Sequence, residues 1–217
     1  MSAAGGPRAP GPDPLLVACA LRIEQAALRS AGRGPARGHT LLRTGMGPSA
    51  AERAVGRALG RPGMDRAAVL ATGFCAGLVP GMHPGDLVVA EETRDPHGTV
   101  PCTGSALLAE ALARAAPGRT VHTGALTGSD HVVRGQERAQ LRATGAIAVD
   151  MESAATLWAA TRGGDRPVAA VRVIVDAPEH ELVRIGTVRG GISAFRVLRA
   201  VLPAFHEWHR SLLLPRR

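Results

Sequence analysis

The sequence contains no lysine and no tyrosine, and each absence excludes a type of chemistry. All 26 basic residues are arginine. Without lysine, the chain cannot form a Schiff base with a carbonyl substrate, and it cannot supply the lysine of a Walker phosphate loop. A dehydrogenase that relies on a Tyr-Lys pair is excluded as well. Any catalysis must therefore rest on other side chains.

Aromatic residues are also scarce, at 2% of the chain. This is too few for the stacking platforms that bind single-stranded nucleic acid. The net charge of +8 would attract polyanions without specificity. However, the arginines are spread along the chain and form no run of five or more. The composition therefore predicts no nucleic-acid partner.

Cysteines are few and widely spaced, at positions 19, 75 and 102. An odd number without a CxxC motif favours free thiols in a reducing compartment. The histidines lack HxxxH and HExxH spacing, so neither a metal site nor a cofactor is predicted. No apolar run approaches the roughly 18 residues of a spanning helix. The segment 16–19 resembles a lipoprotein cleavage box, but too few apolar residues precede Cys19 for a signal peptide. We expect a cytoplasmic protein.

The order of predicted elements indicates one α/β domain. Residues 1–14 are rich in Gly, Pro and Ala, which predicts a disordered segment. From 15 to 217, short apolar strands alternate with helices, without an internal repeat or linker. The expected strands cover 15–21, 39–44, 67–71, 87–90, 120–126, 146–149 and 168–175, and the expected helices cover 23–28, 49–59, 106–115, 137–144, 152–161 and 192–213, the last interrupted by Pro203.

Unusual polar and glycine residues follow several of these strands. In open α/β sheets, ligands collect at the carboxyl ends of the strands. The features at these ends are Glu24, the glycine turn at 45–50, the small-residue loop at 72–77, the pair Asp150 and Glu152, and Asp176. These positions are therefore the candidates for binding or catalytic residues.

The glycine turn at 45–50 reads GMGPSA and precedes a helix. Such a turn can bind anions or sugar oxygens through its backbone N–H groups, or it can simply be a tight turn before a helix. Ser49 and Glu52 have the spacing of a capping box. A dinucleotide fingerprint also needs an acid at the end of the next strand. Asp65 lies before that strand, so this interpretation is rejected.

The carboxylates allow two interpretations each. Asp150 and Glu152 follow a buried strand. In a purely structural interpretation, Asp150 caps the next helix and Glu152 in its first turn gains about 0.3–1 kcal/mol from the helix dipole. Alternatively, one of them accepts hydrogen bonds from a vicinal diol such as ribose. Asp176 ends an apolar strand, where desolvation favours a neutral carboxyl that could deliver a proton. Alternatively, it is an exposed residue that begins a turn before Pro178.

Four motifs together resemble the purine nucleoside phosphorylase and nucleosidase superfamily. They are TGMGPSAAERA at 44–54, TGFCAGLVPGMHPGDLVVA at 72–90, AVDMESAA at 148–155 and VRVIVD at 171–176. The resemblance spans roughly residues 15–200. It implies a three-layer α/β/α sandwich around a central mixed sheet, assembled as a homo-oligomer, for which we expect a dimer.

The resemblance also implies a role for individual residues. Asp176 matches the general acid that protonates or hydrogen-bonds a purine ring nitrogen, and Glu24 matches the glutamate that orients water. Glu152 matches the carboxylate that grips the ribose hydroxyls. The other substrate-binding positions that the resemblance implies are Met151 under the sugar, Val132 and Val133 at the base, Arg172 near the cleft floor, and Gly47, Gly73 and Phe74 in the glycine loops.

The nucleophile is expected to be water rather than phosphate. Phosphorolysis needs positive groups around the anion. The loop at 71–77 has no arginine, and Glu24 would repel phosphate. A phosphate-dependent phosphorylase remains the alternative if Arg22, Arg43 and Arg53 point into the site. A catalytically inactive nucleoside-binding or membrane-peripheral protein is a further alternative.

The segments DMES and RVIVD are most similar in sequence to those of the hopanoid-biosynthesis branch, whose enzymes remove adenine from adenosylhopane to leave ribosylhopane. Methylthioadenosine/adenosylhomocysteine nucleosidases and futalosine hydrolase are the alternatives. Val175 replaces a serine of the former enzymes, and Val132 replaces their stacking phenylalanine.

A lipid-tailed nucleoside substrate fits one further feature, an apolar stripe near the C-terminus. A basic amphipathic helix can lie on an anionic membrane, whereas most such stripes pack in the core. Peripheral membrane association is therefore one expectation, and core or dimer packing is the other. The stripe consists of Phe195, Leu198, Leu202, Phe205, Trp208 and Leu212.

Overall fold

The structure is a computed structural model that describes residues 13–31, 38–178 and 187–212, with the backbone alone for 187–192. Most of the predicted disordered segment, 1–12, lies outside the described residues. The strands are β1 (Leu15–Cys19), β2 (His39–Arg43), β3 (Ala68–Gly77), β4 (Leu87–Asp95), β5 (Gly98–Pro101), β6 (Val121–Gly128), β7 (Ala146–Asp150) and β8 (Val168–Asp176). The helices are α1 (Arg22–Ala31), α2 (Pro48–Leu59), α3 (Ser105–Ala115), α4 (Gln136–Ala143), α5 (Ser153–Thr161), α6 (Thr187–Ala200) and α7 (Leu202–Leu212).

The eight strands form one mixed sheet that curls back on itself. The hydrogen-bonded order is β2-β1-β3-β7-β6-β4-β5, and β8 pairs with both β3 and β4. The strands β3, β7, β6, β4 and β8 therefore make a closed ring of pairs. The pairs β3–β7 and β4–β8 are antiparallel, whereas β3–β8, β4–β6 and β6–β7 are parallel.

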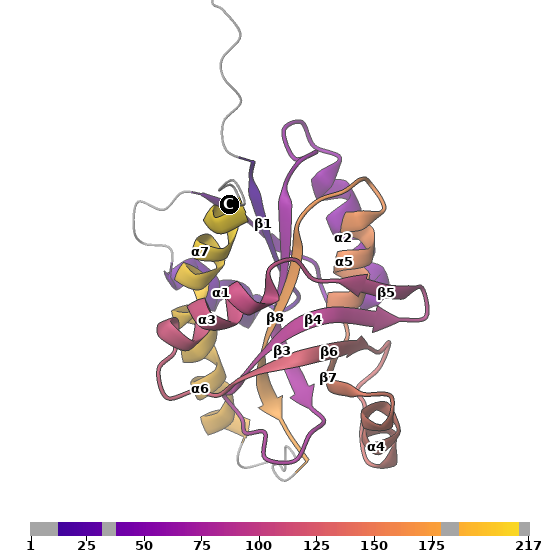
Figure 1. Cartoon of the computed structure of the whole chain (residues 1–217), viewed down its shortest axis with the longest axis vertical. Helices are drawn as coiled ribbons and strands as arrows, with labels where there is room; N and C mark the ends of the chain where they lie inside the picture. The colour runs from indigo at the N-terminus through magenta and orange to yellow at the C-terminus, as the bar shows by residue number, and fades with distance from the viewer. Residues whose placement is uncertain (1–12, 32–37, 179–186, 213–217) are drawn as a thin grey trace, which may run out of the picture.

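Helices cover both faces of this sheet, which confirms the predicted three-layer α/β/α sandwich. Strand β1 is buried at every position, as expected of a continuous apolar strand covered on both sides. One core cluster joins the sheet to α1, α3, α6 and α7, and a second joins it to α2 and α5. Figure 1 shows the first set of helices on one side of the sheet, with α2 and α5 on the other.

Three local predictions were wrong. The segment 72–77 is not a loop but the second half of β3, where Gly73 lets the chain continue at a φ of 136°. The short strand β5 was not predicted. Helix α2 begins at Pro48, after Gly47, with no side-chain cap, so the capping box at Ser49 does not form. Glu52 instead pairs with Arg162, at 3.1 Å.

The C-terminal stripe packs inside the protein. The predicted long helix is two helices that meet at Val201, and Pro203 lies in the first turn of α7, where proline is tolerated. Leu198, Phe205 and Trp208 are at most 1% exposed. The Trp208 Nε1–H donates to the carbonyl oxygen of Thr103, at 2.8 Å. The structure therefore supports the packing interpretation of this stripe.

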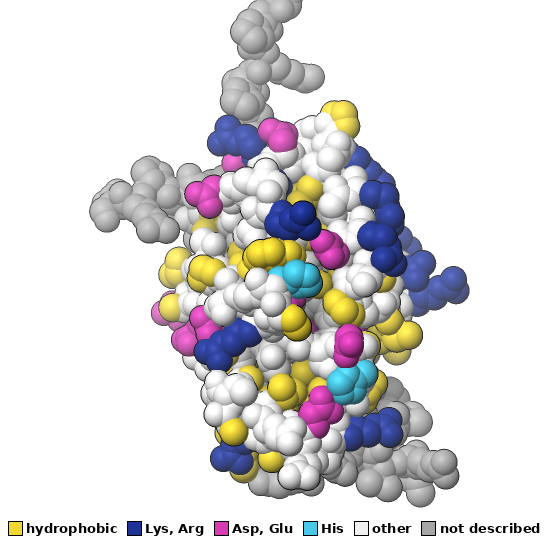
Figure 2. All heavy atoms as spheres, turned by 90° about the vertical axis from the view of Figure 1, so that its right-hand side faces the viewer, with side chains coloured by type: hydrophobic (Ala, Val, Ile, Leu, Met, Phe, Trp, Pro, Cys, Tyr) yellow, Lys and Arg dark blue, Asp and Glu magenta, His cyan; other side chains and the backbone are white. Residues whose placement is uncertain are grey.

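Charged side chains are mixed on the surface seen in Figure 2, where arginines gather along one edge and are elsewhere separated by acidic and apolar side chains. None of the helices in the described ranges combines the length and apolar character needed to cross a bilayer.

We expect Phe205→Ala to lower the free energy of unfolding by about 3–5 kcal/mol, because it empties a fully buried site. Urea unfolding measures this change. Leu107→Ala is the control, since Leu107 is 53% exposed and its loss should change stability by less than about 0.5 kcal/mol. Equal effects of the two substitutions would contradict the packing of α7.

Candidate active site

A cavity of about 220 Å³ lies at the carboxyl ends of β1, β7 and β8. Its lining includes Asp150 and seven of the ten predicted site residues: Glu24, Phe74, Val132, Val133, Met151, Glu152 and Asp176. Arg172, Gly73 and Gly47 do not line it. The two carboxylates that were expected to face one site, Glu152 and Asp176, therefore share a single cavity.

Glu24 is fixed by the backbone. Its Oε2 accepts hydrogen bonds from the N–H groups of Ala20 and Leu21, at 2.9 and 2.8 Å, and its Oε1 accepts one from Phe74, at 2.9 Å. The side chain is 2% exposed. Burial raises the pKa of Glu24, while the charge of Arg172 and the three N–H donors oppose this rise. The carboxylate is thus held rigidly at the cavity wall, with a basicity above that of an ordinary glutamate.

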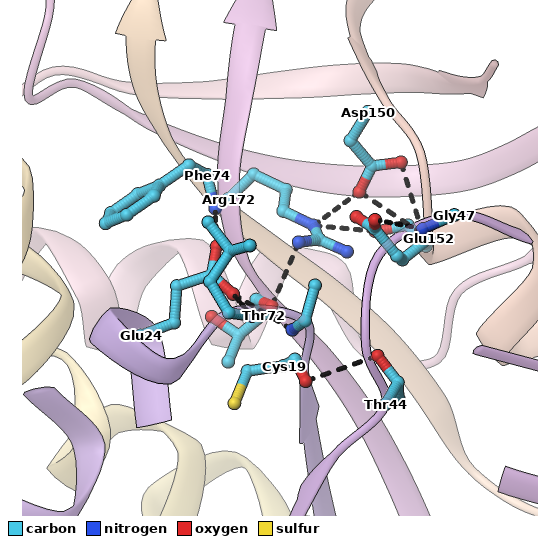
Figure 3. A network of polar contacts seen from close by, with 12 residues as sticks. Cys19, Glu24, Thr44, Gly47, Thr72, Phe74, Asp150, Glu152 and Arg172 are labelled. Atoms are coloured by element: carbon cyan, nitrogen blue, oxygen red, sulfur yellow. Dashed lines mark hydrogen bonds and ion pairs between the residues drawn. The ribbon is translucent and has the colours of Figure 1, made fainter. Parts of the chain in front are cut away.

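Arg172 lies at the centre of a buried polar network rather than in the cavity. Its Nε is 2.6 Å from Asp150 Oδ2 and donates to Ser153 Oγ, at 2.8 Å, while its Nη1 donates to the carbonyl oxygen of Thr72, at 2.9 Å. Figure 3 shows its side chain between Glu24 on one side and Asp150 and Glu152 on the other. Arg172, which was predicted to bind substrate, therefore contacts Asp150, Ser153 and Thr72 and does not line the cavity.

Glu152 is held by the glycine turn that precedes α2. Its Oε1 accepts a hydrogen bond from the N–H of Gly47, at 2.8 Å (Figure 3). Among the described residues, no other donor bonds this carboxylate, so Oε2 remains for a ligand. Burial raises the pKa of Glu152, Arg172 opposes the rise, and Asp150 adds to it. Gly47 thus contacts the carboxylate instead of the cavity.

Asp176, which also lines the cavity, forms an ion pair with Arg138, between Oδ2 and Nη2. The Nε of Arg138 donates to the carbonyl oxygen of Val133, at 3.3 Å. Sequence reasoning missed Arg138, which lies on the predicted helix at 137–144. Nothing in the sequence distinguishes it from the other arginines of this chain, because only the fold brings α4 to the end of β8.

Strand β3 brings the two carboxylates together. Ala76 on this strand pairs with Val149 of β7 on one side and with Asp176 of β8 on the other. Asp150 ends β7, and Glu152 directly precedes α5. The end of one long strand therefore fixes the separation of Glu152 and Asp176, which lie 24 positions apart in the sequence.

Close packing explains why residue 73 is glycine. A Cβ atom at this position would lie 2.4 Å from Glu24 Oε1 and 2.6 Å from Arg172 Nη1. The positive φ of 136° would strain any other residue as well. Gly73 therefore leaves room for both the Glu24 carboxylate and the Arg172 guanidinium beside the strand.

The arginines that would favour phosphate lie elsewhere. Arg22 and Arg43 line a separate open groove beside α1, and Arg53 lies on neither surface. Among the described residues, Arg138 is the only arginine that lines the cavity, and it is paired with Asp176.

Residues 31–203 match the family model of the phosphorylase superfamily. The chain belongs to this superfamily. A search of curated proteins finds no match.

Solved structures resemble this superfamily member along most of its length. A 5'-methylthioadenosine/S-adenosylhomocysteine nucleosidase from Neisseria meningitidis, in complex with methylthio-immucillin-A, is 22% identical, with a TM-score of 0.74 over 90% of this chain and 99% of that one. The futalosine hydrolase of Helicobacter pylori is 16% identical, with a TM-score of 0.74 over 90% and 97%. At these identities, the likeness establishes the fold.

Gly73→Ala should destabilise the protein by at least about 2 kcal/mol more than Gly164→Ala does, because the new methyl group would displace two buried charged side chains, Glu24 and Arg172. The two glycines have similar φ values, 136° and 130°, but the space around Gly164 is open. The comparison by urea unfolding therefore separates crowding from backbone strain. Equal losses would show that the contact at Gly73 is unimportant.

Proposed function

We propose that this protein is an N-ribosyl hydrolase that cleaves the glycosidic bond of an adenosine derivative. The observation that carries the proposal is that Glu24, Glu152 and Asp176 line one cavity of about 220 Å³. Breaking an N-glycosidic bond leaves positive charge on the sugar and negative charge on the base. One carboxylate for the sugar, one for the water and a polar group for the base meet these demands.

At the sugar end, the unbonded Oε2 of Glu152 would accept hydrogen bonds from the ribose hydroxyls. Met151, which lines the same cavity, would pack beneath the sugar. A negatively charged carboxylate bound to the hydroxyls stabilises the electron-poor sugar of the transition state more than the neutral ground state. This difference is what accelerates the reaction.

For the nucleophile, Glu24 would orient a water molecule. Its three backbone donors prevent the carboxylate from turning away. Its raised pKa makes it a better proton acceptor than a solvated glutamate. Phosphate is a poor fit here, because Glu24 and Glu152 would repel it and Arg22, Arg43 and Arg53 do not line the cavity.

At the base end, Asp176 and its partner Arg138 would stabilise the purine as it leaves. Val132 and Val133 would contact the ring. A preorganised polar pair that is largely shielded from solvent stabilises developing charge more strongly than water does.

The 5' substituent has room in an adjoining cavity of about 320 Å³, which shares Met151 with the first. Among possible substrates we propose adenosylhopane. The segments DMES and RVIVD resemble the branch that acts on it, and Val175 and Val132 depart from the methylthioadenosine/adenosylhomocysteine nucleosidases. The solved relatives named above act on other nucleosides, so their substrates remain alternatives for this chain. Assembly as a dimer, a cytoplasmic location and membrane association stay predictions.

The function is tested with a panel of 5'-substituted adenosines, incubated with the purified protein with and without phosphate. We expect free adenine in phosphate-free buffer, because Glu24 supplies an oriented water molecule. Strict dependence on phosphate would instead identify a phosphorylase. Thermal stabilisation by the nucleosides without release of base would identify a binding protein.

The acidic limb of the pH profile tests the two buried glutamates. Both must be ionised to act, and both have a pKa raised above the usual 4.5. We therefore expect kcat/KM to rise with pH, with a midpoint above 4.5. Glu110→Gln, an exposed change on α3, should leave the profile unchanged. A midpoint at or below 4.5 would exclude Glu24 and Glu152 as the groups that limit the rate.

A further inference from the structure

Arginines gather on the exposed side of α1. Arg22, Ala26 and Arg29 are spaced so that they share one face of this helix, and all three are exposed. Together with Arg43, at the end of β2, they line an open groove of about 650 Å³. Among the described residues, no acid lines this groove. Glu24, on the buried side of α1, lines the cavity, so the groove and the cavity share a helix.

A second groove extends this surface onto α6, which packs against α1. It is lined by the exposed Arg196 and Arg199 and by Ala31, at the end of α1. Figure 1 shows α1 and α6 on the same side of the sheet. The five arginines that line the two grooves form what we call the arginine face: Arg22, Arg29, Arg43, Arg196 and Arg199.

The arginine face carries uncompensated positive charge. None of its side chains forms a salt bridge with a described residue. In the described parts of α1, β2 and α6, the single acid is Glu24, and it is buried. Several other exposed arginines do have an acidic partner, for example Arg114, which pairs with Glu207. Like charges that lie together without an acid between them repel one another, so this face favours an anionic partner.

The spread of these charges indicates a flat partner. They come from two helices and a strand and line two grooves, so they do not converge on one point as the ligands of a single phosphate do. Aliphatic side chains lie among them: Ile23 is 48% exposed, and Ala26 lines the first groove. Within the described residues, neither lining contains an aromatic ring that could stack on a base. Arginines beside an exposed aliphatic residue are typical of surfaces that bind anionic bilayers.

We propose that the arginine face docks this protein onto an anionic lipid bilayer, with lipid phosphates in the two grooves and Ile23 at the level of the headgroups. Each arginine near such a surface strengthens binding, and salt weakens it. The inference goes beyond the proposed function, because it rests on charge and exposure and holds whichever nucleoside the cavity accepts. It also differs from membrane contact through the apolar C-terminal stripe, which packs inside the protein.

The test is co-sedimentation of the full-length protein with two kinds of vesicle, one of phosphatidylcholine alone and one of phosphatidylcholine and phosphatidylglycerol in equal parts. We expect binding to the anionic vesicles only, and its loss at high salt. Combining Arg22→Gln, Arg29→Gln and Arg43→Gln should weaken this binding at least about tenfold, because three arginines no longer face the lipid phosphates.

The matched control combines Arg53→Gln, Arg57→Gln and Arg61→Gln. These three arginines are exposed on α2 and just after it, on the opposite side of the sheet, and none forms a salt bridge with a described residue. The control removes the same charge from another face, so its binding should stay within about threefold of the wild type. Thermal unfolding checks that both triple variants are folded.

Three results would overturn the inference. One is a wild type that does not bind anionic vesicles, which needs no variant. Another is an equal loss of binding in the two triple variants, because net charge rather than this face would then be responsible. The third is a soluble occupant, shown by inorganic phosphate that displaces the protein from vesicles at constant ionic strength, or by duplex DNA that binds more tightly than vesicles do.

A second variant keeps the test decisive if the first one does not fold. Arg196→Gln combined with Arg199→Gln should also weaken binding to anionic vesicles, and unchanged binding counts against the inference. Failure of the proposed function looks different, since release of base from the nucleosides is measured without vesicles.

Discussion

The buried ion pair of Arg172 and Asp150 is the interaction on which the rest of the site depends. Both side chains are 1% exposed, and the guanidinium also bonds Ser153 and Thr72. An isolated charge at such a position would be prohibitive, whereas a paired and hydrogen-bonded one is tolerated. Because Arg172 lies between Glu24 and Glu152, its positive charge lets both acids be buried beside the cavity without leaving three carboxylates to repel one another.

The ring of strands gives this network its shape. Strands β7 and β8 do not pair with each other, and at their carboxyl ends the single strand β3 lies between them. Here β3 pairs with both, so the acids that follow these strands meet at its end. Gly73 allows the strand to pass close to Glu24 and Arg172. The cavity is therefore built largely from strand ends and helix starts, the rigid parts of the fold.

The motifs identified residues that share one cavity more accurately than they predicted local structure. Glu24, Glu152 and Asp176 were assigned from strand ends and from the resemblance, and all three line the cavity. The segment 72–77 was assigned as a loop because small residues and glycines are typical of loops, but a strand that passes close to other backbone and side chains needs the same residues. Arg172 and Gly47 were expected to touch the substrate, but they hold Asp150 and Glu152 instead.

The sequence by itself determined the fold class, because apolar strands and amphipathic helices bury their faces in only a few layered arrangements. It also determined which carboxylates stand at strand ends, since these positions follow directly from local patterning. Only the tertiary structure decided that β3 closes the ring, that Arg172 is buried among acids and that Arg138 meets Asp176. The physical reason is that ion pairing and strand pairing act between residues that are distant in sequence, and no local pattern specifies which partners meet.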